Sequence, residues 1–484
     1  MDKKAIVIGA GGAGLAALNA MLEQGFETTL LEKNAEIGGV WESTEYPNLK
    51  IHSKSFNYRF IDFHAVKSLT DRATGSEVLS YMKDYASTKG LYEHILFNKK
   101  VNKILIRKDR KCEIYASSTA NNEQFKFECD IVICALGFTN AGSPNIPHFA
   151  CEKEYKGTIV HSSNFNNAML NDILFNKKKV IVVGAGRSAH EVLMLFDNCK
   201  ENATWLYAKS LWSFSFERLY DNKTIFSWYY LYLLYAYYTM LLKLRRKIPK
   251  YNWVMRWLQK PLVDTLFINP LEPSEDIFQT RRAMMPKDQF DYLRSVKNIK
   301  GKITKLSDHS VHLSNGQVLD VDYVILATGY DRISNLPEII IEKADGTHEQ
   351  YDVKTKDFIY NMLDPEVPEI ALFTTELIYA QQIFGYSLAA QWLARFYSGK
   401  LPNINNSIDK YKNFMSKHKY KWYVPNRYLS NGAPYPHEKD NDYVLTLLLH
   451  DLGVEEKFAK LLVYYGTNEQ AFNQVVAKII NELK

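Results

Sequence analysis

The chain has 484 residues, of which 46% are hydrophobic and 24% are charged. At about 150 residues per domain this length predicts two or three domains, and the ordinary composition excludes a disordered, collagen-like or coiled-coil chain. The formal net charge of +6 is spread along the chain, so nucleic acid is not an expected partner. The five cysteines are an odd number without a C-x-x-C pair, which excludes a disulfide framework and a zinc knuckle and favours a reducing, cytoplasmic compartment.

The N-terminus has the pattern of a strand, a glycine loop and a helix. Ala5 to Ile8 is an all-apolar run typical of a strand buried on both faces of a parallel sheet, and we reject a secretory signal peptide because glycines follow at fixed spacing. A helix is expected through about Gln24, and Thr28 to Leu31 indicates a second strand that ends in Glu32. The loop and the start of the helix contain Gly9, Gly11, Gly12, Ala13 and Gly14.

This G-x-G-x-x-G spacing suits a dinucleotide. The first glycine makes a tight turn, the second lets a pyrophosphate approach the backbone, and the third lets the helix pack on the strand. The N-terminus of the helix adds partial positive charge. Glu32, 23 residues after Gly9, can accept both ribose hydroxyls of an adenosine. We therefore predict that this unit binds FAD.

A second unit of the same kind begins 175 residues later. Its strand is Val180 to Val183, its helix is expected to run to about Asn198, and its second strand is Thr204 to Ala208. Lys209 follows this strand where the first unit has an acid, and an ammonium attracts the 2′-phosphate that a carboxylate would repel. The unit is therefore expected to bind NADPH through Gly184, Gly186, Arg187, Ser188, Ala189 and Lys209. Arg187 is an alternative partner for the phosphate, and Lys209 could instead be an ordinary solvated lysine.

Two more runs, Asp130 to Cys134 and Tyr323 to Leu326, read as buried strands that end in a small residue and a glycine. They bracket the second unit, with Asn140 to Pro147 as a linker. We therefore predict an α/β fold with two Rossmann-like domains, in which the FAD domain is split in sequence by the NADPH domain. The expected domains are residues 1–165 for the first part of the FAD domain, 166–330 for the NADPH domain with a tyrosine-rich insert at about 211–290, and 331–484 for the second part and C-terminal helices.

Two dinucleotide sites in one chain suggest a flavoprotein in which NADPH reduces FAD by hydride transfer. A redox-active disulfide would normally show as closely paired cysteines, and the sequence has none. Molecular oxygen is then the expected acceptor of electrons from the flavin.

Further motifs accompany the two glycine loops. Glu32 is followed by Gly38-Gly39-Val40-Trp41, and Tyr155-x-Gly157-x3-His161-x3-Phe165 lies just before the second glycine loop. With these motifs and Ala327-Thr-Gly-Tyr330, the sequence resembles the flavin-containing monooxygenases, whose fingerprint F-x-G-x3-H-x3-Y/F stands between two dinucleotide motifs. The resemblance runs from about residue 4 to at least residue 400. It implies oxygenation of a small molecule with NADPH and O2 through a flavin C4a-hydroperoxide.

The resemblance also implies roles for single residues. Gly39, Val40 and Trp41 would belong to the FAD site, while Gly157, His161 and Phe165 would lie at the linker and orient NADPH. His52 stands where animal members of the family carry an asparagine near the flavin. A histidine at this position is similar to the plant auxin-forming branch. It is a candidate catalytic and FAD-contacting residue, and the alternative is a core histidine without flavin contact. We assign no metal site and no acid/base pair.

The fingerprint ends in Phe165, whereas that of related Baeyer–Villiger enzymes ends in tryptophan, so we expect N- or S-oxygenation of a soft nucleophile. The first alternative is a Baeyer–Villiger or auxin-pathway-like decarboxylating monooxygenase on the same scaffold. An alternative from another class is a membrane-docked NADPH-binding sensor without turnover.

Ile225 to Leu242 has eighteen residues without a formal charge, six of them tyrosine, and a basic run follows from Lys243. A packed or tunnel-lining helix, an interfacial helix at an anionic membrane surface and a membrane span are the alternatives, in that order of preference. The expected partners are a small-molecule substrate and O2. A peripheral membrane contact through this stretch and a homodimer are further possible interactions.

Overall fold

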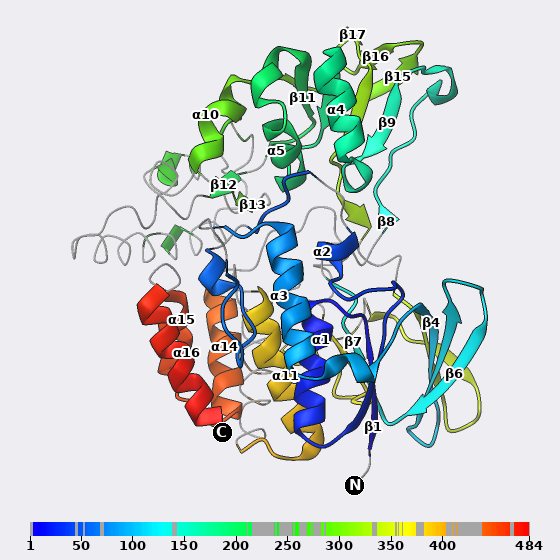
Figure 1. The fold of residues 1–484 in the computed structure, drawn as a ribbon, viewed down its shortest axis with the longest axis vertical. Helices are drawn as coiled ribbons and strands as arrows, with labels where there is room; N and C mark the ends of the chain where they lie inside the picture. The colour runs from blue at the N-terminus through cyan, green and yellow to red at the C-terminus, as the bar shows by residue number, and fades with distance from the viewer. Residues whose placement is uncertain are drawn as a thin grey trace.

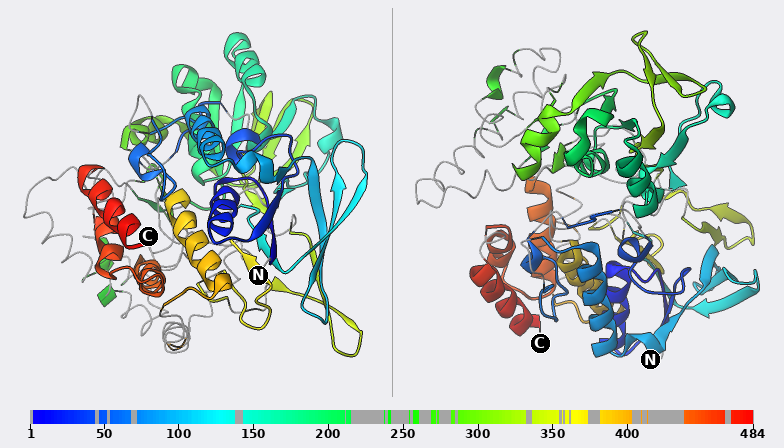
Figure 2. Two further views of the ribbon diagram at one scale, coloured as in Figure 1. Left: turned by 60° about the horizontal axis from the view of Figure 1, so that its bottom comes forward. Right: turned by 45° about the horizontal axis from the view of Figure 1, so that its top comes forward.

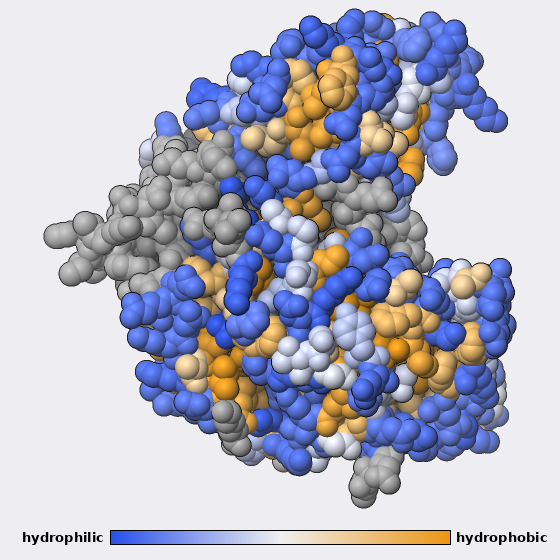
Figure 3. All heavy atoms as spheres, viewed as in Figure 1, coloured by the Kyte–Doolittle hydropathy of each residue, from blue (hydrophilic) through white to orange (hydrophobic). Residues whose placement is uncertain are grey.

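The structure is a computed structural model with two lobes, one above the other in Figure 1 and in Figure 3. The residues that it describes are 3–43, 47–51, 54–67, 72–137, 143–210, 212–214, 237, 240–241, 254, 257–260, 269–271, 273, 282–284, 287–331, 336–353, 356, 358–360, 362–373, 382–402, 409, 413, 438–464 and 469–483.

The lower lobe is built on a five-stranded parallel sheet with the order β22-β7-β1-β2-β3. Its strands are β1 (Lys4–Ile8), β2 (Glu27–Leu31), β3 (Ile95–Leu96), β7 (Ile131–Cys134) and β22 (Ile370–Leu372). The central strand β1 is buried on both faces, as predicted: Val7 packs with the helices and Ile6 with the opposite core. Helix α1 (Gly12–Glu23) packs against α11 (Gln382–Ser398) on the first face.

A second sheet covers the other face of this lobe. It has the order β21-β20-β4-β5-β6 and lies at the right of Figure 1. Its strands are β4 (Lys99–Ile106), β5 (Cys112–Ser118), β6 (Gln124–Cys129), β20 (Glu338–Glu342) and β21 (His348–Gln350). The structure also describes in this lobe the helices α2 (Val40–Ser43), α3 (Gly75–Thr88), α14 (Glu438–Asp451), α15 (Lys457–Tyr464) and α16 (Glu469–Leu483), with 3-10 turns at Ser55–Asn57 and Leu91–His94.

The upper lobe repeats this plan. Its parallel sheet has the order β14-β11-β10-β18-β9, with strands β9 (Thr158–His161), β10 (Val180–Val183), β11 (Ala203–Tyr207), β14 (Lys297–Lys300) and β18 (Tyr323–Leu326). Helices α4 (Asn167–Asn176), α5 (Arg187–Met194) and α10 (Lys287–Ser295) accompany it. The antiparallel strands β15 (Ile303–Ser307), β16 (Ser310–Leu313) and β17 (Val318–Asp320) pack on its other face (Figure 2). The predicted α/β class with two Rossmann-like sheets is confirmed.

Two details of the upper lobe differ from the sequence prediction. Helix α5 ends at Met194 and not near Asn198, and a 3-10 segment, Asp197–Asn202, follows it with Cys199 outside helical geometry. Asp197 and Asn198 have low helix propensity, which agrees with a helix that ends before them. Strand β9 pairs in parallel with β18. The boundary expected at residues 165/166 is therefore wrong for this strand, because β9 is an edge strand of the second sheet.

Within the described residues, the chain passes between the lobes at two places. The outgoing crossing contains β8 (Ser143–Pro144), within the predicted linker, and the return contains β19 (Tyr330–Asp331), which pairs with it antiparallel. After the return, β20 pairs with β4 and β22 pairs with β7. The chain beyond Asp331 thus rejoins the lower lobe, as the sequence indicated.

The tyrosine-rich insert lies mostly outside the described residues. Its described strands, β12 (Trp212–Phe214) and β13 (Arg282–Met284), form a two-stranded parallel pair. Of Ile225 to Leu242, the structure describes only residues 237, 240 and 241. Within the parts of the chain that are described, no helix is long and apolar enough to cross a membrane.

Candidate functional site

The first glycine loop lies at the carboxyl end of β1, where β7 fixes it. Gly9 has φ of +101°, and a Cβ atom at this position would lie 2.7 Å from the carbonyl oxygen of Ala135, just after β7. A Cβ atom at Gly14 would lie 1.7 Å from the Gly9 carbonyl oxygen. The first and third glycines are therefore required by the protein itself. Gly11 differs, because its nearest neighbour would be the Gly39 Cα at 3.9 Å.

Helices α1 and α5 begin without a side-chain cap. The N-cap residues are Gly11 and Gly186, and neither helix start receives a side-chain hydrogen bond from its cap. By contrast, Thr74 caps α3 in a capping box and Asn166 caps α4 through the Met169 N–H. Both helices thus begin at a glycine with no side-chain cap, and the positive end of each helix dipole lies at its glycine loop, where it would stabilise an anionic ligand.

Glu32 lies where the prediction placed it, directly after β2. Its buried carboxylate accepts the Ala10 N–H at 2.6 Å and the Asn34 N–H at 2.9 Å. The acid expected to bind ribose therefore also holds the glycine loop. A carboxylate has about four acceptor positions, so two backbone bonds leave capacity for ribose hydroxyls.

The Gly-Gly-x-Trp motif packs against the same loop. The Gly38 N–H donates to the Ala10 carbonyl oxygen at 3.0 Å, and a Cβ atom at Gly39 would lie 3.1 Å from the Gly11 Cα. Val40 begins α2. The indole N–H of Trp41 donates to the Tyr58 hydroxyl at 2.8 Å, and the two rings meet edge to face. Glu32, Gly38 and Gly39 thus contact the first glycine loop, and Trp41 follows them in contact with Tyr58. His52 lies outside the described residues.

The second glycine loop repeats the first at the end of β10. Gly184 has φ of +138°, and a Cβ atom there would lie 2.3 Å from the Ala327 carbonyl oxygen, just after β18. Around Gly186 nothing lies within 4 Å of an added Cβ atom. Buried Ala189 occupies the position of the third glycine, and half-buried Ser188 precedes it. A pyrophosphate would thus have the same open approach in both lobes.

The two cations proposed for the 2′-phosphate differ in surroundings. Arg187 is half-buried; its Nε donates to Glu191 at 2.7 Å and its Nη1 to Gln289 of α10 at 2.8 Å. Lys209 is exposed, two residues beyond the end of β11. The arginine is therefore part of a contact between α5 and α10, whereas Lys209 lies at the strand end where the second ribose is expected.

The fingerprint residues have mainly structural partners. A Cβ atom at Gly157 would lie 2.5 Å from the Tyr155 ring, whose hydroxyl donates to the Val321 carbonyl oxygen at 2.8 Å. Phe165 is fully buried in the helix-side core of the upper lobe, against Phe196. The ring of Phe165 therefore faces the core, and the expected part of this residue in orienting NADPH stays a prediction.

His161 ends β9 and reaches the return crossing. Its Nε2 lies 3.1 Å from the Gly329 carbonyl oxygen, and its Nδ1 accepts the Ser163 N–H at 3.2 Å. A carbonyl oxygen can only accept, so the proton of the neutral ring is on Nε2. Burial lowers the pKa of His161, although the hydrogen bond to Gly329 opposes this. Its ring also meets Tyr330 edge to face. The partner of this histidine could not be predicted from the sequence, although the glycine after β18 was noted there as a close-approach position.

No group of three or more histidine, cysteine, aspartate or glutamate side chains could hold a metal ion in the part of the chain that the structure describes.

Comparisons with known proteins agree with this geometry. The model of the flavin-binding monooxygenase-like family matches residues 2–433. Flavin-containing monooxygenase 3 of Macaca mulatta is 24% identical over 445 residues, which are 87% of this chain and 79% of the relative. Senecionine N-oxygenase of Tyria jacobaeae is 28% identical over 207 residues, 40% of this chain and 44% of the relative.

Solved structures share the fold. An S-allyl-L-cysteine S-oxygenase from Allium sativum superposes with a TM-score of 0.58 at 16% identity, covering 100% of this chain and 99% of that one. A steroid monooxygenase bound to NADP gives 0.61 at 17% identity, covering 82% and 85%. Since the family model spans most of the sequence, the chain belongs to the flavin-binding monooxygenase-like family, which makes it a flavoprotein monooxygenase with FAD and NADPH as its cofactors.

Proposed function

We propose that the protein uses NADPH and O2 to oxygenate nitrogen or sulfur in a small soft-nucleophile substrate. One observation carries this proposal: two uncapped glycine loops stand at the carboxyl ends of two parallel sheets, and the His161 contact lies where the chain joins them. An open carboxyl edge of this kind is where nucleotides bind in α/β folds.

Each loop has a proposed ligand. FAD would lie on Gly9, Gly11, Gly12, Ala13 and Gly14, with Glu32 toward ribose and Gly39, Val40 and Trp41 behind the loop. NADPH would lie on Gly184, Gly186, Ser188 and Ala189, with Lys209 or Arg187 toward the 2′-phosphate. When bound, FAD accepts a hydride from NADPH and activates O2. His52 remains a predicted flavin neighbour.

His161 acts as a positioning residue. Its Nε2–H is committed to Gly329 and its Nδ1 to Ser163, so neither nitrogen is free to remove a proton from substrate. Because burial lowers its pKa, the ring stays neutral at physiological pH. It would fix the start of the return crossing and thereby the placement of one lobe on the other.

The substrate class rests on two supports. The fingerprint ends in Phe165, and a relative over part of the chain is named an N-oxygenase. Since Phe165 packs in the core, its influence on the reaction would pass through the position of α5 and its glycine loop, with no contact to substrate.

The test measures NADPH consumption against tertiary amines, sulfides, ketones and 2-oxo acids, with product and hydrogen peroxide quantified together. We expect N-oxides or sulfoxides in proportion to NADPH consumed. Turnover confined to ketones or 2-oxo acids would replace this proposal by the Baeyer–Villiger or decarboxylating alternative. Cytoplasmic localisation, a peripheral membrane contact through residues 225–242 and a homodimer stay predictions, which fractionation, vesicle sedimentation and light scattering would test.

A further inference from the structure

Two buried cysteines face each other across an antiparallel strand pair. Cys112 begins β5, Cys129 ends β6, and the two are directly opposite in the register. Their exposed fractions are 0% and 2%. Directly opposite residues on antiparallel strands have Cα atoms about 4.5 or 5.5 Å apart, and both spacings fall within the roughly 4.4–6.8 Å that a disulfide spans. The side chains also share a hydrogen bond.

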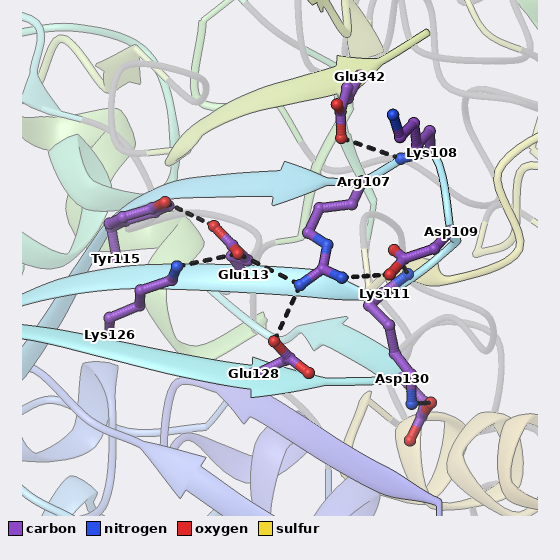
Figure 4. A network of polar contacts seen from close by, with 10 residues as sticks. All are labelled: Arg107, Lys108, Asp109, Lys111, Glu113, Tyr115, Lys126, Glu128, Asp130 and Glu342. Atoms are coloured by element: carbon purple, nitrogen blue, oxygen red, sulfur yellow. Dashed lines mark hydrogen bonds and ion pairs between the residues drawn. The ribbon is translucent and has the colours of Figure 1, made fainter. Parts of the chain in front are cut away.

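Charged contacts on both sides hold this register (Figure 4). On one side, Glu113 lies opposite Glu128, and Arg107 Nη1 bridges the two carboxylates at 3.5 and 3.0 Å. On the other side, Lys111 pairs with Asp130. Like charges directly opposite would destabilise the pair without the guanidinium between them. These charged residues beside the cysteines therefore hold the strand register. The register in turn places the two cysteines opposite each other.

The cysteine pair lies far along the chain from the residues of either glycine loop and between the two sheets of the lower lobe. Both side chains belong to the core formed by the parallel sheet and the sheet of β4, β5 and β6. Strand β6 is an edge strand of that sheet, and the chain passes from Cys129 through Asp130 directly into β7. A bond between the sulfur atoms would thus join the hairpin covalently to the root of β7.

We infer that Cys112 and Cys129 form a reversible disulfide, with hydrogen peroxide as the oxidant. One thiol attacks peroxide, which breaks the O–O bond and gives a sulfenic acid and one water molecule. The second thiol attacks that sulfur, so that the S–S bond forms and a second water leaves. Two S–H bonds are lost and peroxide is reduced by two electrons. The inference does not depend on the proposed function, because the oxidant is added in the test.

The surroundings make this a slow reaction. The hydrogen bond to Cys129 and burial both raise the pKa of Cys112 well above its usual value, so little thiolate is present. Peroxide has to reach the pair while the edge strand is open. The half-buried Cys151 and Cys199 are more accessible and should react first. The cross-strand pair therefore responds to sustained oxidation and not to a brief pulse.

The experiment oxidises the full-length holoprotein carrying Cys151→Ser and Cys199→Ser with hydrogen peroxide, then alkylates it in denaturant and maps the peptides without reduction. Trypsin cuts after Lys111 and Lys126, and a protease that cuts before aspartate separates Cys129 from Cys134. We expect a linked pair of peptides containing Cys112 and Cys129, lost on treatment with dithiothreitol. The melting midpoint should rise by a few degrees, because the bond closes a loop of the unfolded chain.

Two further variants complete the test. Cys129→Ala should abolish the linked peptides and the shift in midpoint, whereas Cys134→Ala, the matched control at another buried cysteine, should keep both. Recovery of Cys112 and Cys129 as alkylated thiols after prolonged oxidation would overturn the inference, and so would a bond from either one to Cys134. If Cys129→Ala does not fold, the peptide map of the parent protein decides alone.

Discussion

The carbonyl oxygen of Gly329 accepts two hydrogen bonds, from the Nε2–H of His161 at 3.1 Å and from the Asn145 N–H at 2.8 Å. One backbone oxygen thus joins the end of β9, the outgoing crossing and the return crossing. Gly329 itself has φ of +83°, which favours glycine. The histidine of the family fingerprint therefore contacts the backbone at the place where the chain passes between the lobes.

Replacement of His161 by Phe should keep the edge-to-face contact with Tyr330 and remove both hydrogen bonds. With Gly329 losing a donor, we expect roughly a ten- to hundredfold slower reduction of the flavin by NADPH and an unchanged FAD content. Anaerobic stopped-flow bleaching measures the rate. His161→Gln, which can still donate, should recover part of it; an unchanged rate in His161→Phe would contradict a positioning role.

Gly11 and Gly14 should respond differently to the same substitution. In Gly11→Ala the new Cβ atom meets only Gly39 at 3.9 Å, so the fold survives, but the pyrophosphate loses its approach and the protein should be isolated largely without FAD. In Gly14→Ala the Cβ atom falls 1.7 Å from the Gly9 carbonyl oxygen, so stability itself should fall. Flavin absorbance and thermal unfolding separate the two effects. Full flavin content in Gly11→Ala would remove this loop from the FAD site.

Lys209→Gln tests the choice of coenzyme. Loss of a charged partner for the 2′-phosphate should cost about 1.5–3 kcal/mol, or roughly ten- to hundredfold in KM for NADPH, with little change for NADH. Arg187→Gln is the comparison, since it also breaks the contacts to Glu191 and Gln289 and should lower stability as well. Equal losses for both coenzymes in Lys209→Gln would exclude it as the phosphate partner.

Because His190 is buried, we expect the protein to lose stability in mild acid. The side chain on α5 is 2% exposed, its Nδ1 is without a hydrogen-bond partner, and burial lowers its pKa from 6.5 to about 3. The unfolded chain therefore binds one more proton between those values, so stability is complete above about pH 6.5 and falls with decreasing pH toward about pH 3. The slope is up to about 1.4 kcal/mol per pH unit.

Urea unfolding between pH 5 and 7.5 measures this slope. His161 contributes in the same direction because its pKa is also lowered. His190→Leu removes one titrating group, so its stability should depend less steeply on pH than that of the parent. Identical slopes in the two proteins would show that His190 does not titrate on unfolding.

The local features of the fold were predictable. Both strand–loop–helix units follow from apolar runs and glycine spacing, since burial on two faces and a tight turn leave direct marks in the sequence. Glu32 and the two loops were identified for the same reason. Pairing between distant segments leaves no such mark. The membership of β9 in the second sheet depends on β18, more than 150 residues away, and the Cys112–Cys129 pair depends on the register of a hairpin. Spacing along the chain could show neither.

The paired crossings have a consequence for how such a chain can be assembled. Pro144 and Tyr330 are direct partners in an antiparallel bridge, so the upper lobe leaves and rejoins the lower one at adjacent points. The strands of each parallel sheet therefore come from one lobe alone, and the segment between Pro144 and Tyr330 is a continuous insertion in the lower lobe. A short link between Ser143 and Asp331 would suffice to restore a continuous lower lobe, and the excised piece has ends close enough to be expressed as a separate folding unit.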